Sequence, residues 1–399
     1  MNQREDQSES LTGLRVLDLS RVLAGPLCCQ MLGDHGATVI KVEPPAGDDT
    51  RRWGPPFVAE DMSAYYSAIN RNKANICLDL STEDGQSVLD LLLANSDVVV
   101  ENFKAGTLAK WGFTDDHLVE RFPELIVARI TGFGTDGPMG SMPGYDAVAQ
   151  AFGGLMSING EADGPALRVG VPVVDMVTGI LAFSGILLAL NARHRTGRGQ
   201  IVDCTLADTA VSLLHPHSAS NLADGRVPVR TGSAHPTVAP YDTFETQDGQ
   251  VFIGVGNDRQ FGTLAELLGM PEISDDNRFR SNSDRLANIG ELTELLGTKI
   301  VSFSKDAIAK DLLARGVPAS AVRDVGEVLR DEHVRHRQMV VEKGKYKGVG
   351  IPIKLSHTPG KVHSTPRAKG ADTSEVLAEL GLDKTRINEL YATEVAREA

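Results

Sequence analysis

RVGVPVVDMVTGILAFSGILLALN, residues 168–191, contains a single acidic residue, Asp175, between a short and a long apolar segment. The short segment, residues 169–174, is predicted to be extended, and the segment Met176–Leu190 is long enough for a buried helix. We therefore expect Asp175 at the helix N-terminus, where free backbone N–H groups and the positive end of the helix dipole stabilise a carboxylate.

Two roles for Asp175 are compatible with this position. Aspartate is a preferred N-cap residue, and Thr178 lies three positions on, where the backbone partner of a cap is expected. A carboxylate held in an apolar setting with little water can also act as a nucleophile or a general base. The rest of the chain has to decide between these roles.

The composition restricts the class of protein. The chain has 399 residues, which suggests two or three domains, or one large domain and one small one. Its 41% hydrophobic and 23% charged residues are ordinary for a globular protein. A formal charge of −13 argues against a general nucleic-acid binder, and an anionic ligand would need local positive groups.

The cysteines and the N-terminal segment indicate the cellular compartment in which the protein is expected. No pair of cysteines has CxxC spacing, so a reduced cytosolic protein is expected rather than a disulfide scaffold or a zinc site. Residues 1–10 are polar and acidic without an apolar core, so no signal peptide is expected. Ile180–Leu190 is short and interrupted by polar residues, so no membrane span is expected. The four cysteines are Cys28, Cys29, Cys77 and Cys204.

The first half of the chain alternates apolar strand patterns with helical patterns. This order predicts βαβ units and a doubly wound, Rossmann-like α/β domain with a parallel sheet. After the first strand the GxGxxG fingerprint is absent and Gly25-Pro26 is the only glycine turn, so a nicotinamide cofactor is disfavoured. The expected strands are Leu14–Leu19, Ala37–Glu43, Arg71–Leu80, Asp97–Val100, Leu125–Ile130 and Ile201–Thr205.

Two loops are expected to meet a ligand, because open α/β sheets bind ligands beyond the carboxyl ends of their strands. One contains Asn102, Phe103 and Lys104; Phe103 could stack on a flat ring, and Lys104 and Lys110 could approach phosphates. An ordinary solvated loop is the alternative. The other is the glycine-dense segment 131–146, which is too long for a simple connection.

A second, smaller α+β domain is expected beyond a change of composition near residues 218–234. We predict a large domain of residues 1–217 and 329–399, a small domain of residues 235–328, and a linker at 218–234. Gly254 and Gly256 flank Val255 in a loop whose backbone can approach a ligand closely.

Other sites receive no support from the sequence. The ten histidines form no HExxH pattern, and His215 and His217 flank a single proline, so no metal is expected. A GxSxG motif is absent, which disfavours an ordinary serine hydrolase.

Eight segments, taken together in this order, resemble the class III CoA-transferases, which include formyl-CoA transferase and carnitine CoA-transferase. The resemblance covers nearly the full chain. It implies a large doubly wound domain joined to a small domain by two long linkers, with two such rings interlocked in a homodimer. The segments are GLRVLDLSRVLAGP (Gly13–Pro26), ATVIKVEPPAGDDTR (Ala37–Arg51), NRNKANICLDL (Asn70–Leu80), DVVVENFKAG (Asp97–Gly106), GYDAVAQAFGGLMSINGE (Gly144–Glu161), PVVDMVTG (Pro172–Gly179), TGRGQ (Thr196–Gln200) and AHPTVAPY (Ala234–Tyr241).

The resemblance implies that Asp175 is the nucleophile. In such enzymes the aspartate attacks the donor thioester to give an aspartyl–acyl anhydride and a CoA thiolate. The thiolate then forms an aspartyl-CoA thioester, and the acceptor carboxylate enters by the reverse steps. Partial desolvation makes a carboxylate a better nucleophile. Oxyanions need backbone N–H donors, which a helix N-terminus and the loop Gly254–Asp258 can supply.

Coenzyme A is thus expected as a co-substrate, with no permanently bound cofactor, and a small carboxylic acid as the partner substrate. Leu23 stands where formyl-CoA transferase has a glutamine, and AHPTVAPY and GVGND resemble members that act on dicarboxylates such as succinyl or glutaryl groups. His235, Arg168 and Arg71 each could hold a second carboxylate. The resemblance places CoA against Val22, Leu23, Ala24, Leu78, Asp79, Asn102, Phe103, Lys104, Lys110, Pro143, Gly144, Tyr145 and Asp146.

Three rival functions stay open. The α-methylacyl-CoA racemases share the fold, but they resemble GHD where this chain has Gly144-Tyr145-Asp146, so the histidine base of a two-base racemisation is missing. A formyl-CoA:oxalate CoA-transferase is a second alternative. A non-catalytic CoA-binding subunit would be indicated by loss of Asp175, which is present.

Overall fold

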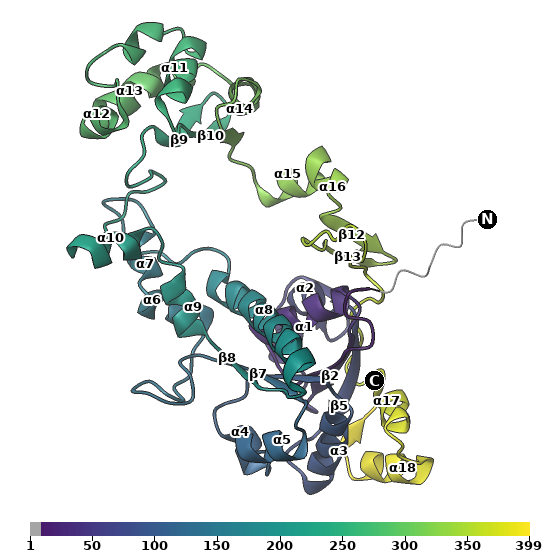
Figure 1. The fold of residues 1–399 in the computed structure, drawn as a ribbon. Helices are drawn as coiled ribbons and strands as arrows, with labels where there is room; N and C mark the ends of the chain where they lie inside the picture. Colours follow the sequence, from purple (N-terminus) through teal and green to yellow (C-terminus); the bar gives the residue numbers. More distant parts are fainter. Residues whose placement is uncertain (1–8) are drawn as a thin grey trace. The chain divides into compact units, whose positions relative to one another are not determined.

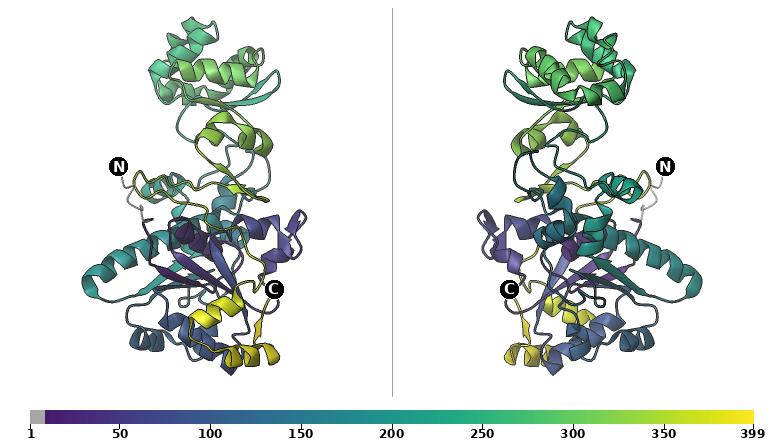
Figure 2. Two further views of the ribbon diagram at one scale, coloured as in Figure 1. Left: turned by 90° about the vertical axis from the view of Figure 1, so that its right-hand side faces the viewer. Right: turned by 90° about the vertical axis from the view of Figure 1, so that its left-hand side faces the viewer.

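The computed structural model describes residues 9–399, and contacts between residues divide the chain into two compact units. Unit 1 contains Met1–Leu155, Val169–Pro216 and Arg335–Ala399, and unit 2 contains Met156–Arg168 and His217–Val334. Most of the polar N-terminal segment 1–10, for which no signal peptide is expected, lies outside the described residues. Figures 1 and 2 show the elements of each unit.

Unit 2 therefore includes residues 156–168, which the sequence prediction had placed in the large domain. Arg230 Nη2 donates to the carbonyl oxygen of Gly164 at 2.8 Å, and the N–H of Gly232 donates to Gly160 at 3.1 Å. These bonds join segments about seventy residues apart. The linker prediction also changes, because α10 (His217–Asp224) is a helix within unit 2.

A seven-stranded sheet forms the centre of unit 1, in the order β14-β5-β2-β1-β6-β7-β8. All neighbours are parallel except β14, which is antiparallel to β5. Without β14 this is the strand order of a doubly wound Rossmann-like sheet, which confirms the predicted fold class. The strands are β1 (Arg15–Asp18), β2 (Thr38–Glu43), β5 (Lys73–Leu78), β6 (Val98–Glu101), β7 (Ile126–Thr131), β8 (Ile201–Thr205) and β14 (Ala396–Arg397).

Helices cover both faces of this sheet, because alternate residues of its strands enter two separate cores. Val16 and Val98 pack on one face against α1 and α8, whereas Leu17 and Val99 pack on the other against α3, α17 and α18 (Figures 1 and 2). The helices of unit 1 include α1 (Ala24–Asp34), α2 (Ala64–Ala68), α3 (Glu83–Ala94), α4 (Thr107–Lys110), α5 (Asp115–Arg121), α6 (Asp146–Phe152), α8 (Val173–Thr196), α9 (Leu206–Ser212), α17 (Thr373–Glu379) and α18 (Lys384–Ala392).

Helix α8 is longer than predicted. It has 24 residues and begins at Val173, so the predicted extended segment 169–174 contains no strand and its end is helical. Within the described residues it alone has the length and apolar composition of a membrane span. It nevertheless packs against α1, β7 and β8, as the core helix of unit 1. Gly179 permits close contact with α1, since a Cβ there would lie 2.5 Å from the carbonyl oxygen of Ala24.

Unit 2 has its own core. A three-stranded antiparallel sheet, in the order β11-β10-β9, packs Val251 and Ile253 against Phe261 and Leu296 of two helices. Its elements are β9 (Tyr241–Thr246), β10 (Gly249–Gly254), α11 (Asp258–Leu267), η2 (Pro271–Ser274), α12 (Asn282–Ala287), α13 (Ile289–Ile300), α14 (Lys305–Ala314), β11 (Ala319–Ala321) and α15 (Val325–Arg330). The remaining elements of the chain are η1 (Asp49–Arg52), β3 (Phe57–Ala59), β4 (Met62–Ser63), α7 (Leu155–Ile158), α16 (Glu332–His336), β12 (Val340–Lys343) and β13 (Tyr346–Val349).

Candidate active site

A cavity of about 470 Å³ lies in unit 1 beyond the carboxyl ends of the central strands. The chain leaves β1 toward β2 and leaves β6 toward β7, in opposite directions, so the cavity occupies the switch point where ligands of doubly wound sheets bind. Its wall comes from the loops after β1, β6 and β7 and from the start of α8. The lining residues are Arg21, Val22, Leu23, Ala24, Asp49, Asn102, Phe103, Lys104, Ala105, Ile130, Thr131, Gly132, Gly134, Ser141, Met142, Pro143, Gly144, Tyr145, Asp175 and Leu206.

Asp175 is the third residue of α8 and lines this cavity. The helix is capped by a different residue, because Oδ1 of Asp146 accepts the backbone N–H groups of Val174 at 2.8 Å and Asp175 at 3.1 Å. Pro172, at the N-cap position, makes no side-chain capping bond. The interpretation of Asp175 as a helix cap is therefore wrong, and its carboxylate has no capping role that would compete with chemistry.

The carboxyl group of Asp175 is a weaker acid than an ordinary aspartate. Burial raises its pKa from the ordinary value of 3.8 to about 7, and the negative charge of Asp146 adds to the rise. Such a shift places protonation close to neutral pH, in the range where catalytic acids, bases and nucleophiles are commonly tuned. Tyr65 of α2 is near enough that the charge of Asp175 contributes to raising its pKa to about 12, after burial.

Two loops of the cavity are joined by Asn102. Its Oδ1 accepts the N–H of Arg21 at 2.9 Å, and its Nδ2 donates to the carbonyl oxygen of Arg21 at 2.7 Å. This reciprocal pair ties the loop after β6 to the loop after β1. Both polar atoms of Asn102 are thus used for shaping the cavity.

The loop after β1 is held in a strained conformation. Val22 has a φ of +70°, which is rare for a β-branched residue. Its N–H points to Oδ1 of Asp48 at 3.5 Å, and Asp48 forms an ion pair with buried Lys41 at 3.2 Å. Lys41 also donates to the carbonyl oxygen of Ser20 at 2.7 Å. The surrounding buried charges therefore fix this loop before any ligand binds.

The structure brings most of the predicted CoA contacts to this one cavity. Arg21, Ala105 and Leu206 also line it and were missed, because no local sequence signal distinguishes them, whereas Thr131 and Ser141 belong to the segment 131–146 that was expected to meet a ligand. The predicted residues in its wall are Val22, Leu23, Ala24, Asn102, Phe103, Lys104, Pro143, Gly144 and Tyr145, together with Asp175.

Four predicted contacts lie elsewhere. Leu78 is fully buried in the core, Oδ1 of Asp79 accepts the N–H and hydroxyl of Ser81, and Lys110 is exposed at the end of α4. Asp146 is buried, and its second oxygen accepts Nε2 of Gln150 at 2.7 Å. The carboxylate of Asp146 is thus committed to holding α8 rather than exposed for a CoA contact.

Of the three candidates for a second carboxylate, Arg71 is occupied. It is buried, pairs with Asp34 at 2.6 Å and donates to the carbonyl oxygen of Val349 at 2.5 Å. His235 and Arg168 belong to unit 2. Nδ1 of His235 accepts the N–H of Thr237 at 3.2 Å, which leaves Nε2 as the donor in the neutral ring.

The glycine loop of unit 2 has no spare backbone donors at its three central positions. The N–H groups of Gly254 and Val255 donate to the carbonyl oxygens of Pro318 and Pro240, and that of Gly256 donates to Oε1 of Gln260. In this conformation these groups do not supply the oxyanion contacts that the sequence suggested. Across residues 9–399, no cluster of three or more His, Cys, Asp or Glu side chains has an arrangement that could hold a metal ion.

Known proteins share this architecture. The sequence profile described as CoA-transferase family III matches residues 11–373. The chain belongs to this family. A succinate–glutarate CoA-transferase of Agrobacterium fabrum (strain C58 / ATCC 33970) is 41% identical over 391 residues, covering 95% of this chain and 98% of that protein. The human succinyl-CoA:glutarate CoA-transferase is 37% identical, with 96% and 89% covered.

A solved structure gives the same result for the fold of this family member. The crystal structure of a CAIB/BAIF family protein from Brucella suis is 41% identical, with a TM-score of 0.86, and the match covers 94% of this chain and all of that chain. The predicted family is confirmed, and the protein is an enzyme of CoA-transferase family III that uses coenzyme A as a co-substrate.

Proposed function

We propose that this enzyme moves CoA from succinyl-CoA to a small dicarboxylic acid, with glutarate as the first candidate. Two of the relatives described above are named for succinate or succinyl-CoA and glutarate. Relatives at 38% and 35% identity are named succinyl-CoA:mesaconate and succinyl-CoA–D-citramalate CoA-transferases. These names share a succinyl group and differ in the second acid, so the donor is the better-supported half of the proposal.

The observation that carries the proposal is Asp175 on the cavity wall, half-buried and not used as a cap. A carboxylate oxygen of Asp175 attacks the thioester carbonyl carbon of succinyl-CoA, and the carbon–sulfur bond breaks to release the CoA thiolate. The products of this step are an aspartyl–succinyl anhydride and the thiolate. The anhydride preserves the acyl-transfer potential of the thioester.

The second half of the exchange uses the same groups. The thiolate attacks the aspartyl carbonyl of the anhydride, which releases succinate and leaves an aspartyl-CoA thioester. The acceptor carboxylate attacks this thioester to form a new anhydride and the thiolate, and the thiolate then attacks the acceptor's acyl carbonyl. The acceptor leaves as its CoA thioester, Asp175 is regenerated, and water takes no part.

The cavity wall suits this chemistry. Leu23, Phe103 and Leu206 give it apolar surface, which limits the water that would hydrolyse an anhydride. Arg21 and Lys104 supply positive charge toward the phosphates of CoA, which the net negative charge of the chain would otherwise repel.

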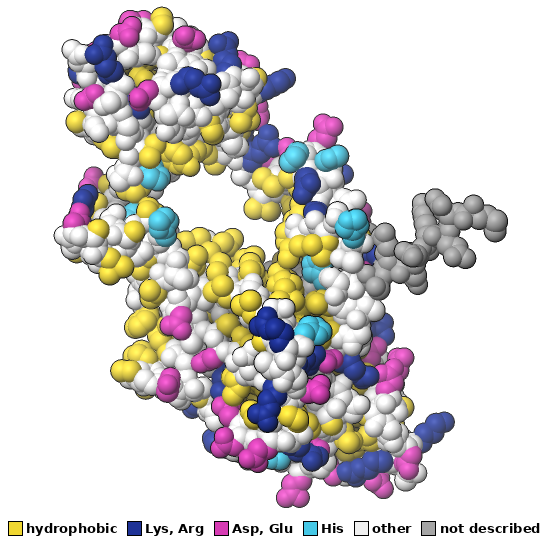
Figure 3. Space-filling view, in the orientation of Figure 1, with side chains coloured by type: hydrophobic (Ala, Val, Ile, Leu, Met, Phe, Trp, Pro, Cys, Tyr) yellow, Lys and Arg dark blue, Asp and Glu magenta, His cyan; other side chains and the backbone are white. Residues whose placement is uncertain are grey.

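We also propose an interlocked homodimer of a cytoplasmic protein, with no nucleic-acid or membrane partner. Helix α8 presents exposed apolar side chains, with Ile180 42% and Leu188 71% accessible. Figure 3 shows apolar side chains gathered over the region of α8 in unit 1. Exposed apolar surface of this kind marks protein–protein contacts. Sedimentation equilibrium tests the dimer, and a monomer at micromolar concentration would contradict it.

Intact-protein mass spectrometry tests the reaction. The enzyme is incubated with succinyl-CoA and compared with an Asp175→Asn variant of the same shape. We expect a covalent CoA adduct on the wild type and none on the variant. When glutarate is added, the adduct should disappear from the protein and glutaryl-CoA should appear in solution. Absence of an adduct, with loss of α-deuterium from a 2-methylacyl-CoA, would instead establish the isomerase alternative.

A further inference from the structure

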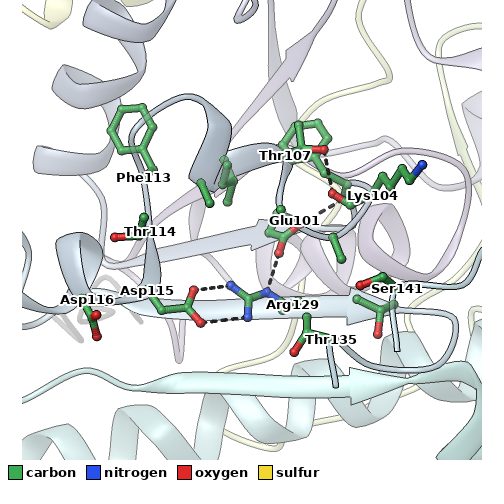
Figure 4. Close-up of a pocket in the computed structure, with 16 residues that line it drawn as sticks. Glu101, Lys104, Thr107, Phe113, Thr114, Asp115, Asp116, Arg129, Thr135 and Ser141 are labelled. Carbon is green, nitrogen blue, oxygen red and sulfur yellow. Dashed lines mark hydrogen bonds and ion pairs between the residues drawn. The ribbon is translucent and has the colours of Figure 1, made fainter. Parts of the chain in front are cut away.

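A second cavity, of about 400 Å³, adjoins the first within unit 1 (Figure 4). Phe103, Lys104 and Ala105 line both cavities, as do Thr131 and Ser141, so this short loop forms part of the wall that the two cavities share. The conformation of residues 103–105 therefore sets part of the wall against which CoA is proposed to bind.

Glu101, the last residue of β6, holds this loop from behind. It is buried, with 4% of its surface accessible, and its Oε2 accepts the backbone N–H of Phe103 at 2.9 Å. Its other oxygen accepts Nε of Arg129 at 2.9 Å. Both carboxylate oxygens are thus used, one for the loop and one for the cation.

Arg129 comes from the neighbouring strand β7, where it is the register partner of Glu101. Its Nη2 and Nη1 also reach the two oxygens of Asp115, at 2.5 and 3.2 Å. Figure 4 shows the guanidinium between the two carboxylates, with Glu101 on the loop side and Asp115 at the start of α5. Asp115 is half accessible to solvent, so Glu101 is the partner that depends most on Arg129.

Removal of the cation would change Glu101. Burial raises the pKa of this carboxyl group, and the hydrogen bond and charge of Arg129 counteract the rise. Without Arg129 the pKa of Glu101 would rise further, and a neutral carboxyl is a weaker acceptor for the Phe103 N–H than a carboxylate.

We propose that Glu101 and Arg129 are positioning residues, which fix the backbone at Phe103 and thereby the shape of the CoA-binding wall. The inference rests on the proposed binding of CoA in the first cavity. A merely structural ion pair would stabilise the sheet without affecting this loop in particular. The two roles therefore differ in whether loss of the pair affects the loop at residues 103–105 in particular.

The test compares Arg129→Met with Arg129→Lys and with a matched control, Arg121→Met. Lysine keeps the charge next to Glu101, whereas Arg121 forms a solvent-exposed pair with Asp90 that is separate from the loop. Two readouts are measured on the full chain, namely amide hydrogen exchange of peptides covering residues 102–106 and calorimetric affinity for free CoA.

We expect Arg129→Met to speed exchange at residues 102–106 and to weaken CoA binding at least tenfold, equivalent to about 1.4 kcal/mol. Arg129→Lys should restore most of the slow exchange at residues 102–106 and most of the affinity for CoA, and Arg121→Met should change neither quantity. In Arg129→Met, exchange in the peptide that contains β1 should stay slow. If Arg129→Met exchanges at the wild-type rate in residues 102–106, the proposal is overturned. Binding of CoA within twofold of wild type overturns it as well.

A wild type that does not bind CoA would contradict the proposed function, while exchange at residues 102–106 would still decide whether the pair positions the loop. If Arg129→Met does not fold, Arg129→Lys and Glu101→Gln take its place. Glutamine cannot both accept from Phe103 and pair with Arg129 as a carboxylate does, so faster loop exchange supports the proposal and unchanged exchange overturns it.

Discussion

Asp146→Asn separates the two effects of Asp146 on the nucleophile. An asparagine oxygen can still accept the N–H groups of Val174 and Asp175, so the cap of α8 should be preserved, although the bond accepted from Gln150 is lost. The negative charge that helps to raise the pKa of Asp175 is removed. The variant therefore changes the electrostatics of Asp175 with little change in its position.

The size of the effect is bounded by the structure. The pKa of Asp175 is raised from 3.8 to about 7, and burial is a larger cause than Asp146. The charge of Asp146 therefore accounts for less than half of the rise, which is at most about 1.5 pH units or ~2 kcal/mol. Because attack needs the ionised carboxylate, the activity of the wild type should fall as the pH drops through about 7.

The assay is kcat/KM for succinyl-CoA between pH 5 and 8.5, which reports groups of the free enzyme. Asp146→Asn should move the acidic limb to lower pH by up to about 1.5 units and retain activity at pH 8. Asp146→Ala, which loses the cap, should lose activity at every pH. Asp90→Asn, a surface control paired with Arg121, should leave the limb in place. An unmoved limb in Asp146→Asn, or one moved to higher pH, would refute the electrostatic reasoning.

Three further predictions address stability and loop geometry. Asp175→Asn should stabilise the fold at pH 8 by up to about 4 kcal/mol and hardly at all at pH 3, since the folded carboxyl keeps a proton that the unfolded chain loses between pH 3.8 and about 7. Urea unfolding across this range checks the prediction, and a gain independent of pH would contradict it. Gly179→Val should destabilise unit 1 by at least about 2 kcal/mol, because its Cβ would meet the Ala24 carbonyl at 2.5 Å; a denaturation midpoint equal to wild type would be the contrary result. Asn102→Ala removes both bonds to Arg21 and should raise the KM for succinyl-CoA about tenfold with a smaller change in kcat, whereas loss confined to kcat would show that Asn102 acts otherwise.

The sheet could be predicted from sequence because its signal is local. The strands near residues 14–19, 37–43 and 97–100 are apolar runs separated by turns and helical patterns, and such runs are typical of parallel strands buried on both faces. The short antiparallel strand β14 has only two residues and carries no comparable pattern.

The site was harder to predict because its important contacts span long sequence distances. The cap of α8 comes from Asp146, 29 residues before Asp175, whereas the capping rule examines only the next few residues. The pairing of Glu101 with Arg129 likewise depends on the register of two neighbouring strands. Motifs placed Asp175 and the residues after β1 and β6 in one site, but not the side chains that hold them.

Residues 156–168 were assigned to the large domain instead of unit 2 for the same reason, namely that the contacts involved span a long sequence distance. Nothing within the segment shows that its backbone bonds to Arg230 and Gly232, which lie further along the chain. Composition therefore gave no boundary before residue 217, whereas contacts between residues assign 156–168 to unit 2.

The edge strand β14 has a consequence for the order in which the chain can fold. Ala396 pairs with Leu78, and the hydroxyl of Thr373 donates to the carbonyl oxygen of Arg397, so the sheet of unit 1 is completed by residues that are synthesised after all its other strands. The main segment of unit 2, His217–Val334, is continuous and emerges from the ribosome earlier. The parallel strands of unit 1 must therefore wait, with the β5 edge unpaired, until residues 396–397 have been synthesised.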